Sequence, residues 1–185
     1  MKYFIALLGL LTFLACKDDY TIKPIGHVRL EYPEPNYKSF ISDCDFTFEY
    51  SDLAEKRDKE NPCWFVLHYP DMKANIYLTY FPIQSQEDLA IKIKDSEKLV
   101  QEQTVKASYI APREFIFEKK KVYGTLFELG GESAINLQFH ATDSLKNLIS
   151  GSVYFSTPPQ YDSLQPAIQY MKKDVMHLIE TLEWK

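Results

Sequence analysis

Residues 108–155 read SYIAPREFIFEKKKVYGTLFELGGESAINLQFHATDSLKNLISGSVYF. Apolar and polar residues alternate along much of this stretch, as at Ile135, Leu137, Phe139 and Ala141, and such alternation is typical of half-buried strands. Short polar or glycine-containing breaks divide the stretch into four expected strands, over 108–119, 122–129, 134–142 and 148–155. Consecutive strands with such short links favour an antiparallel sheet. Gly151, inside the last strand, indicates a bulge or a close approach of another group.

The flanking sequence adds three strands and two helices. The strands are expected over 45–50, 64–69 and 74–81. Ser85 and Asp88 have the spacing of a helix cap, and apolar residues at helical spacing predict a helix over 86–106. A final helix, capped by Asp162 or Ser163, is expected to reach about Leu182. The predicted class is α+β: a single domain with a mainly antiparallel sheet of about seven strands, packed by two helices.

Composition narrows the function without naming it. The chain has 185 residues, with 21 Lys and Arg against 26 Asp and Glu, for a formal net charge of −5. This length suits one domain. An aromatic content of 15% excludes a largely disordered protein, because disordered chains are poor in aromatics. An acidic chain without a basic block is a poor nucleic-acid binder.

The N-terminus carries the features of a lipoprotein signal. Lys2 is the one charged residue before Cys16, and residues 3–14 are mostly apolar. That run is too short to cross a bilayer as a helix, but it fits a secretory signal peptide. It ends in Phe13-Leu14-Ala15-Cys16, which resembles a bacterial lipobox. We therefore expect residues 1–15 to be removed and Cys16 to be lipidated; the alternative is an ordinary signal peptide with an incidental cysteine.

The segment after Cys16 has the composition of a tether. Residues 16–40 contain several prolines, which favour extended backbone, and we expect the globular domain to occupy 41–185. Lys17-Asp18-Asp19 resembles a short signal for surface export of lipoproteins in Bacteroidota. A solvated tether is the alternative interpretation. By analogy with other lipoproteins, Lys17 favours the outer membrane, with the periplasmic or surface face left open.

Two cysteines remain after lipidation, Cys44 and Cys63. Exported proteins occupy compartments where disulfides persist, so a Cys44–Cys63 bridge is favoured over two buried free thiols. It would close the charged, turn-like segment 52–61. Neither cysteine has neighbours at metal-ligand spacing, and we expect no metal and no cofactor.

No catalytic motif stands out. The sequence lacks a Gly-x-Ser-x-Gly elbow, a His-Glu-x-x-His helix and a P-loop. His27, His68, His140 and His177 are scattered, and a packed or surface role is the favoured interpretation of each. His140 and Asp143 could form an acid–base pair, although a turn cap by Asp143 explains that residue more simply.

Two surface features are consistent with contacts to other molecules. The run Lys119-Lys120-Lys121 suits a solvated hairpin tip, with contact to an acidic partner as the alternative. Most of the aromatic residues fall in predicted strands and belong in a core. Any that are exposed would suit contact with a protein or a glycan.

Several stretches together resemble one known family. They are the signal ending at Cys16 and residues 20–24, 29–33, 63–65, 76–80, 104–107, 138–144, 151–155 and 178–184. In this order and spacing they resemble the gliding-motility lipoprotein GldD family of Bacteroidota. His140 occupies a position where tyrosine is more usual in that family, which speaks against a catalytic histidine. The strand–helix order is also similar to Mog1/PsbP-like domains, at the level of fold alone.

The resemblance implies a cell-envelope lipoprotein that is required for gliding and is linked to the type IX secretion machinery. It implies no catalytic residues, and Cys16 alone carries over as a functional position. The leading hypothesis is thus a non-enzymatic interaction domain, anchored to the outer membrane, whose partners are proteins of that apparatus. An envelope or surface glycan-binding module is the second hypothesis, and a small hydrolase built on His68 or His140 is the third.

Overall fold

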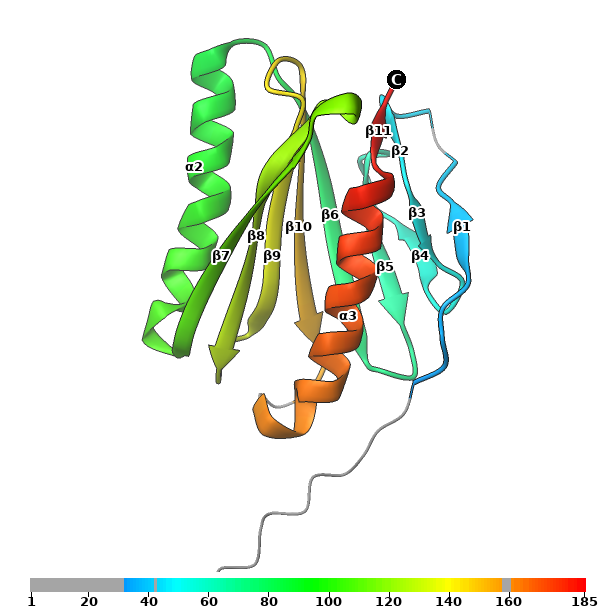
Figure 1. Cartoon of the computed structure of the whole chain (residues 1–185), viewed down its shortest axis with the longest axis vertical. Coiled ribbons are helices and arrows are strands. Elements are labelled where there is room, and N and C mark those ends of the chain that lie inside the picture. Colours follow the sequence, from blue (N-terminus) through cyan, green and yellow to red (C-terminus); the bar gives the residue numbers. More distant parts are fainter. Residues whose placement is uncertain (1–31, 42, 158–160) are drawn as a thin grey trace, which may run out of the picture.

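The computed structural model describes residues 32–41, 43–157 and 161–185. Its main element is a seven-stranded antiparallel sheet in the order β4-β5-β6-β10-β9-β8-β7 (Figure 1). The strands are β4 (Glu55–Asp58), β5 (Trp64–Tyr69), β6 (Ala74–Pro82), β7 (Ala107–Phe117), β8 (Val122–Gly131), β9 (Ile135–Thr142) and β10 (Asn147–Phe155). Together with two long helices, this sheet confirms the predicted α+β class.

One strand of the main sheet, β4, was not predicted from the sequence. We expected residues 52–61 to form a turn-like loop, but Glu55–Asp58 pairs with β5 as the edge strand β4. All four of its residues are exposed, so the segment has no apolar alternation that could reveal a strand. Its charges are typical of an edge that must not pair with another chain.

The strand expected over 45–50 does not join the main sheet. It divides into β2 (Phe46–Thr47) and β3 (Glu49–Ser51). β2 pairs with the C-terminal β11 (Glu183–Trp184), and β3 pairs with β1 (Tyr37–Ser39). The alternation of this segment still has a physical basis, because Phe46 and Phe48 are both 1% exposed.

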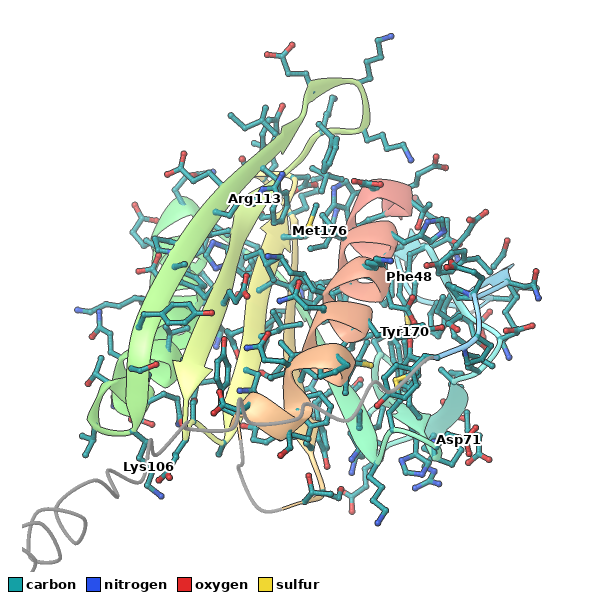
Figure 2. All side chains as sticks on the ribbon, turned by 60° about the horizontal axis from the view of Figure 1, so that its bottom comes forward. Phe48, Asp71, Lys106, Arg113, Tyr170 and Met176 are labelled. Atoms are coloured by element: carbon teal, nitrogen blue, oxygen red, sulfur yellow. A yellow bond between two sulfur atoms is a disulfide. The ribbon has the colours of Figure 1, made fainter. Side chains whose placement is uncertain are left out.

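An aromatic stack explains why these short strands leave the sheet. The rings of Phe46 and Phe48 stack on Phe40, with centroids 5.7 and 4.7 Å away, and Phe65 of β5 stacks on the same ring at 4.5 Å. Figure 2 shows Phe48 on the side of α3 (Tyr161–Thr181) that faces β1 and β3. Phe40 is 1% exposed. The folded domain therefore begins before residue 41, and includes β1 and Phe40, which we had placed in the tether.

The two helices cover opposite faces of the sheet. α2 (Gln86–Glu102) begins at Ser85, whose side chain accepts a hydrogen bond from the Asp88 backbone at 3.2 Å, as predicted. Its α-helical part ends before the expected residue 106, because residues 103–105 tighten into the 3₁₀ turn η2. α3 already includes Asp162 and Ser163, so neither residue is the helix cap that we expected. Figure 1 shows α2 beside β7 and β8, and α3 toward β1 and β3.

The side chains of β9 alternate between the two faces of the sheet. Its Leu137, Phe139 and Ala141 belong to the main core, which also contains the apolar stripe of α3. Between them, Gln138 donates to Ser96 of α2 at 3.2 Å. The large hydrophobic core thus lies between α3 and the sheet. On the α2 side, the buried apolar cluster consists of Ile83, Leu89 and Leu148, with Phe81 and Ile93 packed against it.

β7 and β8 form a long hairpin that carries the lysine run at its tip. Pro112 lies within β7 and does not break it, because β7 is an edge strand and Pro is tolerated there. The short helix η3 (Glu118–Lys120) makes the turn, followed by Lys121 at φ 52°. Lys120 Nζ donates to the carbonyl of Glu180 at 2.8 Å, and Trp184 Nε1 donates to the carbonyl of Lys121 at 2.9 Å. These two hydrogen bonds join the hairpin tip to the C-terminal segment of the chain.

Gly151 marks a close approach between neighbouring strands. A Cβ atom at this position would lie 2.2 Å from Cε1 of Phe139, a fully buried ring on β9. The irregularity in the pairing of β10 with β9 comes later, between Val153 and Tyr154. Of the two explanations that the sequence offered for Gly151, the structure supports the close approach.

Gly151→Ala should lower the free energy of unfolding by about 1–3 kcal/mol, because the added methyl group overpacks a buried site. Gly130→Ala is the matched control. Its Cβ would also meet a ring at 2.1 Å, but that ring belongs to Tyr109, which is 43% exposed and can turn away. Urea unfolding of both variants measures the difference, and equal losses of stability would contradict this explanation.

Candidate functional site

The sheet face that carries α2 is left partly open over β5 and β6. Trp64 on β5 and Tyr77 on β6 are 40% and 41% exposed there. In the strand register, Trp64 lies opposite Thr79, and Thr79 lies opposite Ser150 of β10. Paired residues project to the same face of a sheet. On this face, the side chains therefore change from aromatic rings on β5 and β6 to short hydroxyl side chains on β10, which is nearer to α2.

Two adjoining hollows follow this face, and we call them together the aromatic groove. The first has a volume of about 460 Å³ and is lined by Lys59, Glu60, Asn61, Trp64, Phe65, Tyr77, Leu78 and Thr79. The second has a volume of about 280 Å³ and is lined by Tyr77, Thr79, Phe81, Lys92, Asp95, Ser96, Leu99, Ser150 and Ser152. Because Tyr77 and Thr79 line both, the hollows lie side by side between α2 and the loop that precedes β5.

The aromatic rings of the groove are held in place. Trp64 Nε1 donates to the carbonyl of Tyr80 at 3.1 Å, which fixes the indole. Tyr77 packs edge-on against Tyr154 of β10, with ring centroids 5.4 Å apart. Lys59 Nζ lies 5.7 Å from the Tyr77 centroid, and a lysine at this distance is attracted to the face of the ring. These contacts restrict ring motion, so a ligand would not have to order the rings on binding.

A buried polar network lies beneath the groove. Gln138 of β9 is fully buried, and its Nε2 donates to Ser96 of α2 at 3.2 Å and to Ser150 at 3.4 Å. Ser152 donates to Gln138 Oε1. The hydroxyls of Ser96 and Ser150 are 3.3 Å apart. These hydrogen bonds satisfy the amide of Gln138, as a buried polar group requires. They also hold hydroxyl groups among the residues that line the second hollow.

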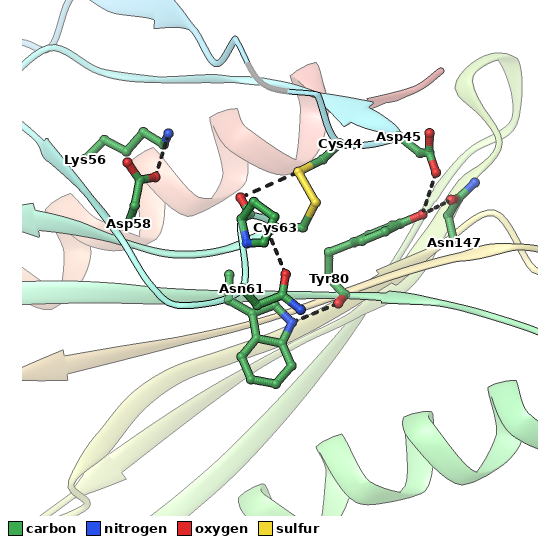
Figure 3. The surroundings of a disulfide bond; sticks show 10 residues. Cys44, Asp45, Lys56, Asp58, Asn61, Cys63, Tyr80 and Asn147 are labelled. Atoms are coloured by element: carbon green, nitrogen blue, oxygen red, sulfur yellow. Dashed lines mark hydrogen bonds and ion pairs between the residues drawn. A yellow bond between two sulfur atoms is a disulfide. The ribbon is translucent and has the colours of Figure 1, made fainter.

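A disulfide closes the loop that forms one end of the groove. Cys44 and Cys63 are bonded, with their Cα atoms 5.9 Å apart, and this is the pairing that the sequence favoured (Figure 3). Cys63 directly precedes Trp64. The side-chain Oδ1 of Asn61 accepts a hydrogen bond from the backbone N–H of Cys63 at 2.9 Å, and the backbone carbonyl of Asn61 accepts one from the N–H of Trp64 at 3.0 Å. The disulfide therefore connects the segment directly before β2 to the groove wall.

Tyr80 lies close to the disulfide but on the core face of β6. Its hydroxyl donates to Asn147 at 2.7 Å and lies 3.4 Å from the Asp45 carboxylate (Figure 3). Burial and the neighbouring Asp45 raise the pKa of Tyr80 to about 12. The hydroxyl thus stays protonated at physiological pH and serves as a hydrogen-bond donor.

A second polar cluster joins the N-terminal segment to α3. Tyr37 donates to Asp174 Oδ1 at 2.9 Å, and Tyr170, labelled on α3 in Figure 2, donates to the carbonyl of Pro33 at 2.9 Å. The ring of Tyr32 packs edge-on against that of Tyr170, with centroids 5.4 Å apart. We call these contacts the N-terminal clamp. They fix the path of the chain where it enters the domain.

Asp174 is the buried charge of this clamp. It is 3% exposed, and its Oδ2 atom has no hydrogen-bond partner within residues 32–41, 43–157 and 161–185. Burial raises the pKa of Asp174, and hydrogen bonds from Tyr37 and Tyr69 partly oppose this shift. The carboxylate helps to position the N-terminal segment, but it is costly to keep ionised.

Each of the three described histidines contacts a neighbouring side chain. His140 is buried beside Phe127, and burial lowers its pKa. Asp143 accepts three backbone hydrogen bonds at 2.8–2.9 Å, so the turn-cap interpretation is correct. His68 contacts Asn75 at 2.8 Å. His177 stacks on Tyr37 and contacts Glu49 at 2.9 Å.

Other predicted positions are not described by the structure. The lipidation position Cys16, the signal Lys17-Asp18-Asp19 and His27 lie outside the described residues. Within the part of the chain that is described, no cluster of three or more His, Cys, Asp or Glu side chains could hold a metal ion. In the same part, no helix combines the length and apolar character needed to cross a bilayer.

The groove itself was not predicted from the sequence. Trp64, Tyr77 and Phe81 fall in strands and were expected to lie mostly in the core. A signal was present in the alternation, since Phe65 and Leu78 are buried and their neighbours must face the other way. The sequence gives no indication that α2 leaves that second face open over β5 and β6.

Comparison with known proteins identifies a family. A family model described as "Gliding motility lipoprotein GldD" matches residues 17–184. No curated protein matches the chain. A crystal structure of a protein from Bacteroides thetaiotaomicron VPI-5482 matches over 80% of this chain and 48% of its own, so this chain spans about half of that protein. The identity is 19% and the TM-score is 0.40.

Replacing both Cys44 and Cys63 by serine should lower the free energy of unfolding by about 3 kcal/mol, the value expected for a closed loop of about 20 residues. Chemical denaturation with and without a reductant measures this. The wild type should fall to the stability of the double variant when reduced, and the variant should not respond. A reductant effect on the variant would contradict the explanation.

Asp174→Asn should become increasingly stabilising, relative to the wild type, as the pH rises. The pKa of Asp174 is raised in the folded state, so its contribution is greatest below the ordinary pKa near 4 and is lost as the pH rises through the folded pKa. Urea midpoints measured from about pH 2 to pH 8 test this.

Asp143→Asn is the matched control with the opposite sign. Burial alone would raise the pKa of Asp143, but hydrogen bonds from residues 145–147 outweigh burial and lower it. That variant should lose most stability at neutral pH and converge with the wild type in acid. The same trend in both variants would show that the two carboxylates do not act as described.

Proposed function

The chain belongs to the family of gliding motility lipoproteins called GldD, and from this membership we propose that it is a non-enzymatic docking domain, anchored by lipid to the outer membrane. There it supports the gliding and type IX secretion machinery through contacts with proteins of that apparatus. The observation that carries the proposal is the extent of the family match. It covers residues 17–184, which is nearly all of the chain after Cys16.

Lipidation of Cys16 supplies the proposed attachment. Each buried methylene of an acyl chain contributes about 0.8 kcal/mol, and two or more chains together give a stable anchor. Residues 1–15 would then be the signal peptide. Lys17 directly after the anchor favours the outer membrane, by analogy with other lipoproteins. Lys17-Asp18-Asp19 as a signal for surface export stays a prediction, so the face of the membrane is left open.

The N-terminal clamp supports a role in docking. Residues 16–31 can span at most about 50 Å, at roughly 3.3 Å per residue. Tyr32 and Tyr37 then contact α3 directly. The domain would therefore be confined to a layer near the membrane. Confinement raises the local concentration of the domain toward a membrane partner, and a modest interface then suffices.

The three described histidines contact other side chains: His68 contacts Asn75, His177 contacts Glu49, and His140 lies beside Phe127. Glycan binding is a second candidate function, favoured by the exposed Trp64 and Tyr77 of the aromatic groove.

Cys16→Ala should move the protein from the membrane fraction to the soluble fraction, because it removes the acylated thiol. In a deletion strain, this variant should restore neither colony spreading nor secretion of proteins into the medium. Fractionation, immunoblotting and spreading assays measure these effects, with the wild-type gene as the positive control. Normal spreading by a soluble form would refute the anchoring proposal.

The matched control is Cys63→Ser, which changes a cysteine but leaves the lipidation position intact. It should remain in the membrane fraction even if its stability falls. Immunoblots establish that both variants accumulate. If the deletion affects neither spreading nor secretion, the role in the gliding machinery is wrong for this chain, whatever the result for anchoring.

A further inference from the structure

We propose that the aromatic groove is a binding site for a glycan chain, which it holds through uncharged pyranose rings. The proposal goes beyond membership of the family and does not depend on lipid anchoring. It rests on three properties of the groove: preformed aromatic faces, polar groups without protein partners, and balanced charge.

The aromatic part of the groove suits the apolar face of a sugar. A pyranose ring presents axial C–H groups on its flat faces, and these pack on exposed aromatic rings. Trp64 and Tyr77 are 40% and 41% exposed, and the indole is fixed by its hydrogen bond to Tyr80. Trp and Tyr combine a large apolar surface with a polar end. The first hollow, of about 460 Å³, falls in the usual range of small-molecule sites.

The polar part of the groove suits sugar hydroxyls. Thr79 and Asp95 both line the second hollow. Within residues 32–41, 43–157 and 161–185, neither the Thr79 hydroxyl nor the Asp95 carboxylate has a side-chain hydrogen bond or an ion pair. Ser150 and Ser152 line the same hollow and are hydrogen-bonded to Gln138. Hydroxyls and a carboxylate beside aromatic rings can receive and donate the hydrogen bonds that a sugar offers.

The charges of the groove favour an uncharged ligand. Lys59 and Glu60 line the first hollow, and Lys92 and Asp95 line the second. Each hollow thus has one cation and one anion. The ammonium of Lys92 also lies 5.3 Å from the centroid of the Phe81 ring. It is therefore already attracted to the face of that ring. A strongly anionic or cationic ligand would find no net attraction.

Two other classes of ligand fit less well. A peptide added as a strand needs free backbone groups, but β5 and β6 are paired on both sides within the sheet. An acyl chain offers no hydrogen bonds to the hydroxyls of Thr79, Ser150 and Ser152, which line the second hollow. A glycan requires no free sheet edge, and its hydroxyls can form those hydrogen bonds.

The test is calorimetric titration of the full chain, purified with its anchor in a detergent that contains no sugar headgroup. The first probes are chitohexaose and maltohexaose. We expect binding in the micromolar to millimolar range by at least one of them, weakened about tenfold or more by Trp64→Ala and by Tyr77→Ala. Tyr109→Ala is the matched control, since Tyr109 is 43% exposed but lies on β7 at the far edge of the sheet.

Asp95→Ala keeps the proposal testable if the aromatic variants fold poorly. Asp95 is exposed and lies on the surface of α2, so its replacement should leave stability unchanged and weaken glycan binding about threefold or more. Failure of all glycan probes to bind the wild type would overturn the proposal. Wild-type affinity in all three groove variants would overturn it too, because binding would then lie elsewhere.

The source of the glycan is decided by a second pair of probes. Peptidoglycan strands released by lysozyme represent the cell wall, and lipid-free polysaccharide released from the cell surface represents the outer face. Binding of either in a groove-dependent manner supports the proposal and identifies the source, and binding of neither, together with failure of both hexaoses, overturns it. The Cys16→Ala chain should bind the same probes with unchanged affinity, so failure of the anchor and failure of the groove are separate results.

Discussion

The fold depends on the burial of the apolar stripe of α3 against one face of the sheet. Met171, Val175, Leu178 and Ile179 are each at most 1% exposed, and they belong to the same core cluster as Leu137 and Phe139 of β9. Full burial of each such side chain contributes about 1.5–3 kcal/mol before entropic costs. The same helix also organises its surroundings. β3 packs along it, and Tyr37 of β1 donates to its Asp174. Its end leads into β11, and Lys120 of the hairpin tip donates to the carbonyl of Glu180.

One consequence is that the second face of the sheet does not need a large hydrophobic core. α2 is secured by a small apolar cluster at one end and by the hydrogen bonds of Gln138 and Ser96 further along. Such a polar layer adds less stability than a packed core, since a hydrogen bond contributes only about 1 kcal/mol net. It does, however, place hydroxyl groups beside exposed aromatic rings. The stability comes from one face, and the binding surface that we propose lies on the other.

The two covalent features of the chain, proposed lipidation and the observed disulfide, act at different ends of this arrangement. The disulfide joins Cys44, in the segment directly before β2, to Cys63 and so fixes the loop beside Trp64. The N-terminal clamp fixes the segment that leads toward Cys16, through Tyr37 and Asp174. In a membrane-anchored GldD domain, the clamp would restrict how the groove is presented relative to the bilayer. A docking role and a glycan site can therefore coexist in one domain of this size.

The sequence by itself determined the elements whose period is visible: six strands of the main sheet, both helices, the Ser85 cap, the family, and the cysteines that pair. It did not reveal β4, because four exposed charged residues have no apolar period, nor the departure of Phe46 and Phe48 from the sheet, because alternation looks the same whichever partner a strand has. Only the tertiary structure decided that Trp64 and Tyr77 face an open groove. Alternation places two residues on the same face, but whether a helix covers that face depends on how α2 packs, and this is set by contacts between residues far apart in the chain.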